Sequence, residues 1–285
     1  GFYYSSTKRN GGDRDVYYMD PNNPKAEKLI LQVKGGGWGI QDISPDGKQL
    51  VLGEYVSINE SYLWLLDIAT GKLTEITDRS VKGVSQSNAN FSSIPNEIWF
   101  ITDKDNEFER LASMNLNTKK TTYYTSNIPW NIENFKLSND KKSIVFITNE
   151  GGLNKMYLMN TATKAYKEVK NLPIGLISDP HFTKDNQTIF FNQSTAQSAS
   201  DVYQLNIQTG KINRWTESEL GEMQPSDMSV PKFIEWKSFD DLKISGFYYP
   251  ASPKFKGKRP VIIMIHGGPE GQTMASFLGT NNFYT

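Results

Sequence analysis

Short runs rich in Ile, Val, Phe and Trp recur along the first three quarters of the chain, separated by polar turns. Each run ends a segment that starts with an apolar residue, then Ser or Thr, then a polar turn. Four such segments align without gaps: 43–51, 91–99, 137–145 and 182–190. Their first residues, at positions 43, 91, 137 and 182, are 48, 46 and 45 residues apart. This spacing matches the period of about 40 to 50 residues that is typical of β-propeller blades.

A second landmark recurs in each unit, 23 or 24 residues after the first: 67–72, 115–120, 160–164 and 206–211. The Pro-Asp-Gly turn at 45–47 is suited to close a tight hairpin, because Pro presets φ and Gly supplies positive φ. The β-rich runs that follow are expected strands: 49–53, 97–102, 143–148 and 188–192. One such sheet cannot cover both of its apolar faces, so we expect the sheets to stack around an axis.

The first unit is incomplete. Residues 2–6 match 190–194, and residues 16–20 match 202–206, but the hairpin segment that should precede Phe2 is missing. The pattern therefore predicts an all-β propeller with four whole blades plus a partial blade, its ring incomplete in this chain, over residues 1–227.

The pattern changes after Trp215. Residues 217–230 are polar and read as a linker, and a hairpin is expected around the turn at 239–241. Residues 261–265 then form a continuous apolar run without alternation, which is typical of a strand covered on both faces in a largely parallel sheet. We expect residues 228–285 to be the truncated start of an α/β-hydrolase domain.

The expected strand is followed by His266, Gly267, Gly268 and Pro269. Glycines at the end of a strand let the backbone turn sharply and aim N–H groups at open space, which is how α/β-hydrolases build half of an oxyanion hole. Losing one such donor typically costs about 3 to 4 kcal/mol of barrier. A plain Gly-rich turn between a strand and a helix is the alternative interpretation.

A propeller followed by a hairpin with a Phe-Asp turn and by the segment 260–272 resembles the prolyl oligopeptidase family of serine peptidases, in its acylaminoacyl-peptidase or dipeptidyl-aminopeptidase-like branch. The resemblance covers essentially the whole chain. It implies a propeller that caps an α/β-hydrolase, and hydrolysis of short peptides, by exopeptidase or oligopeptidase action, through an acyl-enzyme, without a cofactor or metal. By position, Gly268 would donate its N–H to the oxyanion, Gly267 would shape the turn and His266 would support the loop.

Two departures from the family pattern matter. Asp241 stands where relatives usually have Gly, so either its φ is unusual or the turn differs. The sequence contains no Gly-x-Ser-x-Gly, so we expect the Ser, Asp and His of the triad to follow Thr285, and residues 1–285 to be inactive alone. Two alternatives remain: a noncatalytic TolB-like propeller that binds proteins, and an esterase on the same scaffold.

The amino-acid composition limits the possible binding partners. Lys plus Arg and Asp plus Glu each number 31, which removes the basic surface that nucleic acid or an anionic membrane requires. We therefore expect short peptide substrates, no nucleic acid and no membrane, and leave a homo-oligomer open. The absence of Cys excludes disulfides and thiolate chemistry. The sequence begins at Gly1 without an initiator Met or a charged-then-apolar leader, so any signal peptide would lie upstream or not exist, and periplasm and cytoplasm are both compatible.

For several other residues we expect a structural role rather than a functional one. We expect His181 to be structural, with a substrate contact as the minor alternative. The Asp-containing segments 13–15 and 103–105 lack the Gly and distal Glu of a calcium loop and are expected to be solvated turns. Tryptophans are expected to pack in the core or between blades: Trp38, Trp64, Trp99, Trp130, Trp215 and Trp236. Some relatives bind a substrate amino terminus with propeller carboxylates, for which the candidates are Glu107, Glu109 and Glu150.

Overall fold

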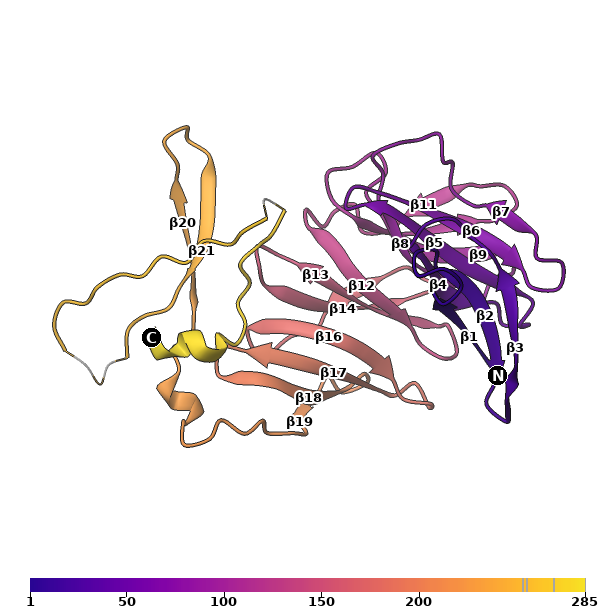
Figure 1. Ribbon diagram of the computed structural model, residues 1–285. Coiled ribbons are helices and arrows are strands. Elements are labelled where there is room, and N and C mark those ends of the chain that lie inside the picture. The colour runs from indigo at the N-terminus through magenta and orange to yellow at the C-terminus, as the bar shows by residue number, and fades with distance from the viewer. Residues whose placement is uncertain (253, 255, 269, 285) are drawn as a thin grey trace. The chain divides into compact units, whose positions relative to one another are not determined.

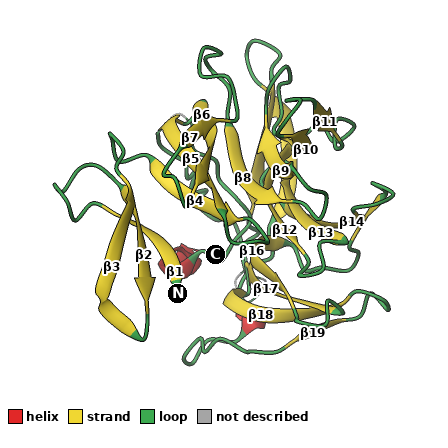
Figure 2. Cartoon of the chain, turned by 90° about the vertical axis from the view of Figure 1, so that its right-hand side faces the viewer, coloured by secondary structure: helices red, strands yellow, loops and turns green. Residues whose placement is uncertain are grey.

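The computed structural model describes residues 1–252, 254, 256–268 and 270–284. Within these residues the secondary structure is almost entirely β, and helix is limited to two short 3₁₀ turns, η1 (Pro225–Asp227) and η2 (Gly279–Tyr284). Figure 2 shows this dominance of strands. None of the described helices is long and apolar enough to cross a membrane.

Consecutive strands pair with one another to form antiparallel sheets (Figure 1). The first sheet has three strands: β1 (Phe2–Ser6), β2 (Asp15–Asp20) and β3 (Asn23–Leu31). The second has β4 (Trp38–Ile43), β5 (Gln49–Ser57), β6 (Glu60–Asp67) and β7 (Leu73–Glu75). The third has β8 (Gln86–Phe91), β9 (Glu97–Thr102), β10 (Arg110–Asn115) and β11 (Thr121–Tyr123).

The remaining strands continue the same arrangement. The fourth sheet has β12 (Asn131–Leu137), β13 (Ser143–Asn149), β14 (Asn154–Asn160) and β15 (Tyr166–Glu168). The fifth has β16 (Gly175–Phe182), β17 (Thr188–Thr195), β18 (Ser198–Asn206) and β19 (Ile212–Arg214). A separate hairpin pairs β20 (Lys232–Lys237) with β21 (Lys243–Tyr248). Four four-stranded sheets and one three-stranded sheet confirm the predicted four whole blades and partial blade.

The chain divides into two compact units, residues 1–134 and 135–285. This division falls inside the array of blades, within β12. It does not test the predicted domain boundary near residue 228, which stays a prediction.

The first repeated turn depends on one left-handed residue. Gly47, Lys141 and Asn186 occupy the same place in their segments and have φ of 69°, 59° and 59°. In the second segment that place is taken by Pro95, whose ring forbids positive φ. The left-handed conformation therefore moves one residue on, to Asn96, with φ of 57°. The strands stay in register although this turn differs.

The second repeated turn is the same in all four blades. An Asp or Asn side chain accepts a hydrogen bond from the N–H of the Thr three residues later, as Asp67 does from Thr70 at 2.8 Å. Asn115, Asn160 and Asn206 bond Thr118, Thr163 and Thr209 in the same way. The following residue is left-handed in every case: Gly71, Lys119, Lys164 and Gly210. This local bonding explains why an Asx-x-x-Thr pattern marks every blade.

Alternation along the inner strands buries both faces of each sheet. In the first unit, Leu50 and Leu52 of β5 pack with Val16 of the first sheet. Val51, which points to the opposite face, packs with Phe91 of the third sheet. Successive residues of a strand face opposite sides, so a sheet between two neighbours needs apolar residues at every position. Figure 1 labels these three neighbouring sheets.

The second unit is built in the same way. Val145 and Ile147 of β13 pack with Ile189 and Phe191 of β17 in one buried cluster. Phe146, on the other face of β13, stacks on Tyr157 with ring centroids 4.9 Å apart.

Three sequence-based expectations need correction. Asp15 is not in a solvated turn: its carboxylate is buried, 2.6 Å from Arg9 Nε, and it accepts the Val33 N–H. The tryptophans divide, because Trp38 and Trp99 are buried whereas Trp130, Trp215 and Trp236 are exposed. Trp130 precedes β12 and Trp215 follows β19, so both lie just outside strands, whereas Trp236 lies in β20.

The predicted strand at 261–265 is wrong for this chain. These residues have no regular secondary structure, and their exposed fractions range from 55 to 86%. An inner strand of a parallel sheet forms only where neighbouring strands satisfy its backbone groups. No strand pairs with this segment among the described residues. The predicted hairpin before it does form, and Asp241 has the unusual φ, 62°.

Candidate active-site loop

The loop 266–272 turns at Gly268. This residue has φ of +64°, in the left-handed region that favours glycine. The N–H of Gly271 donates to the Gly268 carbonyl at 2.9 Å and closes the turn. A Cβ at Gly271 would lie 2.5 Å from the Gly267 oxygen, so that position also requires glycine. Pro269 lies outside the described residues.

The other two predicted site residues are adjacent and exposed. Gly267 is not left-handed, and a Cβ there would meet no atom within 4 Å. The turn therefore depends on Gly268 rather than on Gly267. His266 Nδ1 lies 3.3 Å from the Gly267 carbonyl oxygen, which makes its contact local to the loop. The oxyanion role of these residues stays a prediction.

The second unit anchors the segment after the loop. Asn149 Nδ2 donates to Gln272 Oε1 at 2.7 Å, and the N–H of Ala275 donates to the Gly152 carbonyl at 3.1 Å. A Cβ at Gly152 would lie 2.9 Å from both the Phe247 ring and the Thr273 oxygen. Sequence reasoning missed Asn149 and Gly152. The Gly151-Gly152 pair between two strands was the available signal of a close backbone approach.

A cavity of about 510 Å³ lies beside the loop, lined mainly by apolar side chains. Phe247 and Met264 contribute apolar surface, and His266, Tyr249 and Asn281 contribute polar groups. Burial raises the pKa of Tyr249, and its hydroxyl is buried without a hydrogen-bond partner among the described residues. The cavity therefore combines an apolar wall with a neutral phenol and an imidazole, a lining that suits an apolar side chain next to a polar group.

The three candidate carboxylates differ in how their charge is compensated. Glu150 is paired with Lys155 at 2.6 Å and accepts the Tyr157 hydroxyl at 2.8 Å. Burial raises the pKa of Glu109, and its described partner is the neutral Ser85 hydroxyl at 2.8 Å. Glu107 is exposed. Glu109 is thus the partly buried carboxylate that is left without a described cation.

The remaining candidates have structural positions. His181 is an exposed residue of β16 opposite Phe190 of β17. Asp103 accepts the Ser85 N–H at 2.8 Å, and burial raises its pKa. Across the described residues, no group of three or more His, Asp or Glu side chains is arranged to hold a metal ion.

Comparison with known proteins identifies similar chains. The family model described as the prolyl oligopeptidase N-terminal β-propeller domain matches residues 1–218. A dipeptidyl-peptidase 5 of Aspergillus fumigatus is 23% identical over 94% of this chain and 41% of its own length. The chain therefore spans about two fifths of this curated relative.

Solved structures share the fold. The crystal structure of puromycin hydrolase has a TM-score of 0.80 at 13% identity, covering 99% of this chain and 46% of that one. TolB from Acinetobacter baumannii has a TM-score of 0.58 at 16% identity, covering 82% of this chain and 56% of that one. At these identities the likeness supports the fold alone.

Proposed function

Because the chain belongs to the prolyl oligopeptidase family, we propose that it is the propeller and the start of the hydrolase domain of a serine peptidase. The whole protein would hydrolyse short peptides, as an exopeptidase or oligopeptidase, through an acyl-enzyme. The family match over residues 1–218 is the observation that carries this proposal. The triad would come from outside residues 1–285.

In this proposal the Gly268 N–H is half of the oxyanion hole. Its left-handed φ of +64° supports the role, because this conformation turns the chain sharply after the apolar segment 261–265. The amide would hold the negative charge that develops on the carbonyl oxygen during attack by the serine. A preorganised amide costs no reorganisation at that moment.

Glu109 is our candidate for binding the amino group of the substrate. Its carboxylate is partly buried and has no described cation, so a substrate ammonium group would supply the missing charge. Glu150 is the weaker candidate because Lys155 already neutralises it.

The test uses the full-length gene product. A fluorophosphonate probe should label it, and it should hydrolyse short chromogenic peptides. Gly268→Ala places a side chain in a left-handed conformation and displaces the amide. We expect kcat/KM to fall about 10² to 10³-fold, mainly through kcat.

Gly257→Ala is the matched control. Gly257 is also left-handed, with φ of 93°, and a Cβ there would likewise meet no atom within 4 Å. This variant should keep the activity of the unmodified enzyme. If Gly268→Ala also kept the activity of the unmodified enzyme, the oxyanion assignment would be contradicted.

A noncatalytic TolB-like propeller that binds proteins is the second candidate, because its propeller fold is compatible with the likeness to TolB. It predicts a full-length product that the fluorophosphonate probe does not label. An esterase on the same scaffold would be labelled but would prefer ester over peptide substrates.

A further inference from the structure

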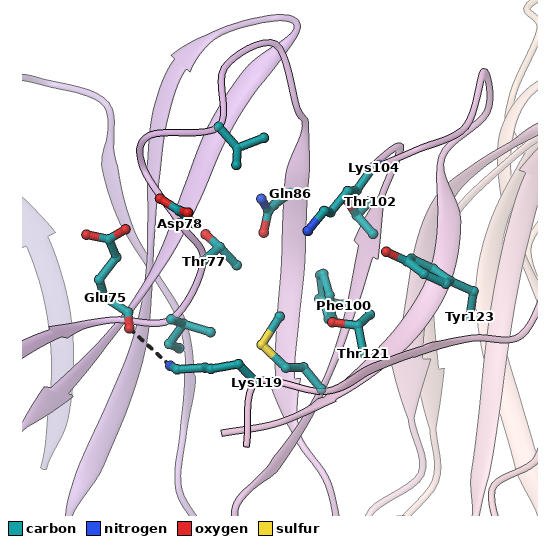
Figure 3. Close-up of a pocket in the computed structure, with 13 residues that line it drawn as sticks. Glu75, Thr77, Asp78, Gln86, Phe100, Thr102, Lys104, Lys119, Thr121 and Tyr123 are labelled. Carbon is teal, nitrogen blue, oxygen red and sulfur yellow. Dashed lines mark hydrogen bonds between the residues drawn. The ribbon is translucent and has the colours of Figure 1, made fainter. Parts of the chain in front are cut away.

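A second cavity, which we call the blade-face cavity, lies within the first unit (Figure 3). Its volume is about 400 Å³. The end of β7 and the loop that follows form one side, and the face of the β8–β11 sheet forms the other. The lining residues that matter to the argument are Asp78, Gln86, Phe100, Lys104, Met114 and Tyr123.

Gln86 carries an unused amide into this cavity. The residue is only 7% exposed, and its backbone N–H and carbonyl both bond the Ser61 hydroxyl. Its side-chain amide has no hydrogen-bond partner among the described residues, and Figure 3 shows it facing the hollow. The amide atoms are not fully enclosed, so in the free protein they contact solvent within the cavity. A ligand that offers both an acceptor and a donor would satisfy the amide.

One side of the cavity is cationic. Figure 3 shows the Lys104 ammonium, from the turn after β9, and the Tyr123 hydroxyl, from β11, facing the hollow. No carboxylate of the described residues forms a salt bridge with Lys104. The Arg110 guanidinium lies over the Tyr123 ring, 4.1 Å from its centroid, and holds that ring in place. These groups suit a carboxylate.

The opposite side carries two carboxylates, those of Asp78 and Glu75, and one ammonium group, that of Lys119, so its net charge is negative. Asp78 accepts the Ser80 hydroxyl at 2.6 Å and the Ser80 N–H at 2.8 Å, both with Oδ1. These bonds, with a smaller contribution from the charge of Lys104, lower the pKa of Asp78, so the group is charged at neutral pH. Its Oδ2 atom has no described partner. Glu75 lies on the same side, where its carbonyl accepts Lys119 Nζ at 3.1 Å (Figure 3). This side suits an ammonium group.

The floor between the two sides is apolar. Phe100 and Met114 line it and belong to the buried core cluster of the unit. A ligand therefore meets a cationic side, an anionic side, an amide and an apolar floor. A dipeptide with free termini and apolar side chains is the smallest common molecule that matches all four features.

We propose that the blade-face cavity binds such a dipeptide. Its carboxylate would lie at Lys104 and Tyr123, its ammonium group at Asp78, its peptide bond at the Gln86 amide, and an apolar side chain on Phe100 and Met114. This site lies in the first unit and uses none of the residues assigned to hydrolysis.

Calorimetric titration of the 285-residue chain with the dipeptide Ala-Leu tests the proposal. We expect saturable 1:1 binding at millimolar peptide. N-acetyl-Ala-Leu and Ala-Leu amide each lose one charge, so each should bind about tenfold more weakly. Equal binding of all three peptides, or no saturable binding of Ala-Leu, would overturn the assignment.

Gln86→Met keeps the side-chain volume and removes the amide. It should weaken binding of Ala-Leu about five- to tenfold, whereas the unfolding temperature should change little, because the substitution removes no described hydrogen bond of the fold. A merely structural Gln86 would give a lower unfolding temperature and unchanged affinity. Lys104→Met should weaken binding about tenfold, and the matched Lys72→Met, at a turn outside the cavity, should not. Unchanged affinity in both Gln86→Met and Lys104→Met would contradict the proposal.

Discussion

Two apolar segments of the chain have similar compositions and opposite structures. Residues 98–101 of β9 are at most 2% exposed, whereas residues 261–265 are at least 55% exposed and form no strand. β9 is hydrogen-bonded between β8 and β10, and no described strand pairs with the second segment. An apolar, β-branched sequence permits a strand, but a partner on each edge is what makes the strand form.

The β20–β21 hairpin is intermediate between these two segments, because its strands are paired but its side chains are exposed. Its strands pair in register, with Trp236 opposite Ile244, and the Phe233 and Phe247 rings are 5.8 Å apart. Yet Trp236 and Phe233 remain exposed. A tight turn with a left-handed Asp241 supplies one partner strand, and no described sheet covers the faces.

The largest effect should come from one substitution made in both apolar segments. Ile101→Ala removes a fully buried side chain from β9 and should lower the free energy of unfolding by about 2 to 5 kcal/mol. Ile263→Ala removes a side chain that is 79% exposed and should change it by less than about 0.5 kcal/mol. Urea denaturation measures both. Similar losses would show that the second segment is buried in solution.

A buried and an exposed carboxylate should differ in the same way, but with a smaller change in the free energy of unfolding. Asp201 is buried and accepts hydrogen bonds from Arg214 at 2.6 Å and from Thr216 at 3.0 Å. Burial alone raises the pKa of Asp201, but these bonds and that of Ser198 outweigh it and lower the pKa. Asp201→Asn should cost about 1 to 3 kcal/mol at pH 7.

The pH dependence follows from that lowered pKa. Because the folded-state pKa lies below the unfolded value, the stabilisation is complete above the unfolded pKa and disappears as the pH falls through the folded one. The loss in Asp201→Asn should therefore shrink at acidic pH. Asp241→Asn, in the exposed Lys237–Asp241 pair of the hairpin, is the control and should change stability little at any pH. A loss in Asp201→Asn that does not vary with pH would contradict the assignment.

The smallest change in stability should come from alanine substitutions at two left-handed glycines. Gly71→Ala and Gly268→Ala both place a side chain at positive φ where a Cβ would meet no atom closer than 3.9 Å. Gly71 closes a blade hairpin, so its substitution should destabilise the fold by about 1 kcal/mol. Gly268 lies in an exposed loop, and its substitution should leave the urea midpoint unchanged. A shift of that midpoint would mean that the loop contributes to the core.

The regular spacing made the starts of the inner strands predictable. Strands were predicted to start at residues 49, 97, 143 and 188, and the observed strands start at these residues. The predicted ends of these strands were less accurate. β5 continues to Ser57 and β17 to Thr195, beyond the predicted ends at 53 and 192, because antiparallel pairing with the next strand extends each hairpin past its apolar run.

At the candidate loop, the sequence singled out the Gly267-Gly268 pair but assigned the turn to Gly267, whereas the left-handed residue is Gly268. It also gave no sign of the contacts that anchor the segment after the loop. The bond from Asn149 to Gln272 joins residues 123 positions apart, and no local pattern announces such a contact. The position of the Gln86 amide was equally hidden, because only packing shows that a polar side chain faces a cavity.

The sequence by itself determined the four whole blades and the partial blade of these residues, the two repeated turns and the alternation of the inner strands. These properties follow from local chemistry: an Asx side chain bonds a backbone N–H three residues away, and side chains alternate along a strand. The tertiary structure decided which apolar runs became strands, which carboxylates gained a cation and which polar groups remained unpaired. Those outcomes depend on partners from distant parts of the chain, because backbone and charged groups are stabilised only when another segment satisfies them.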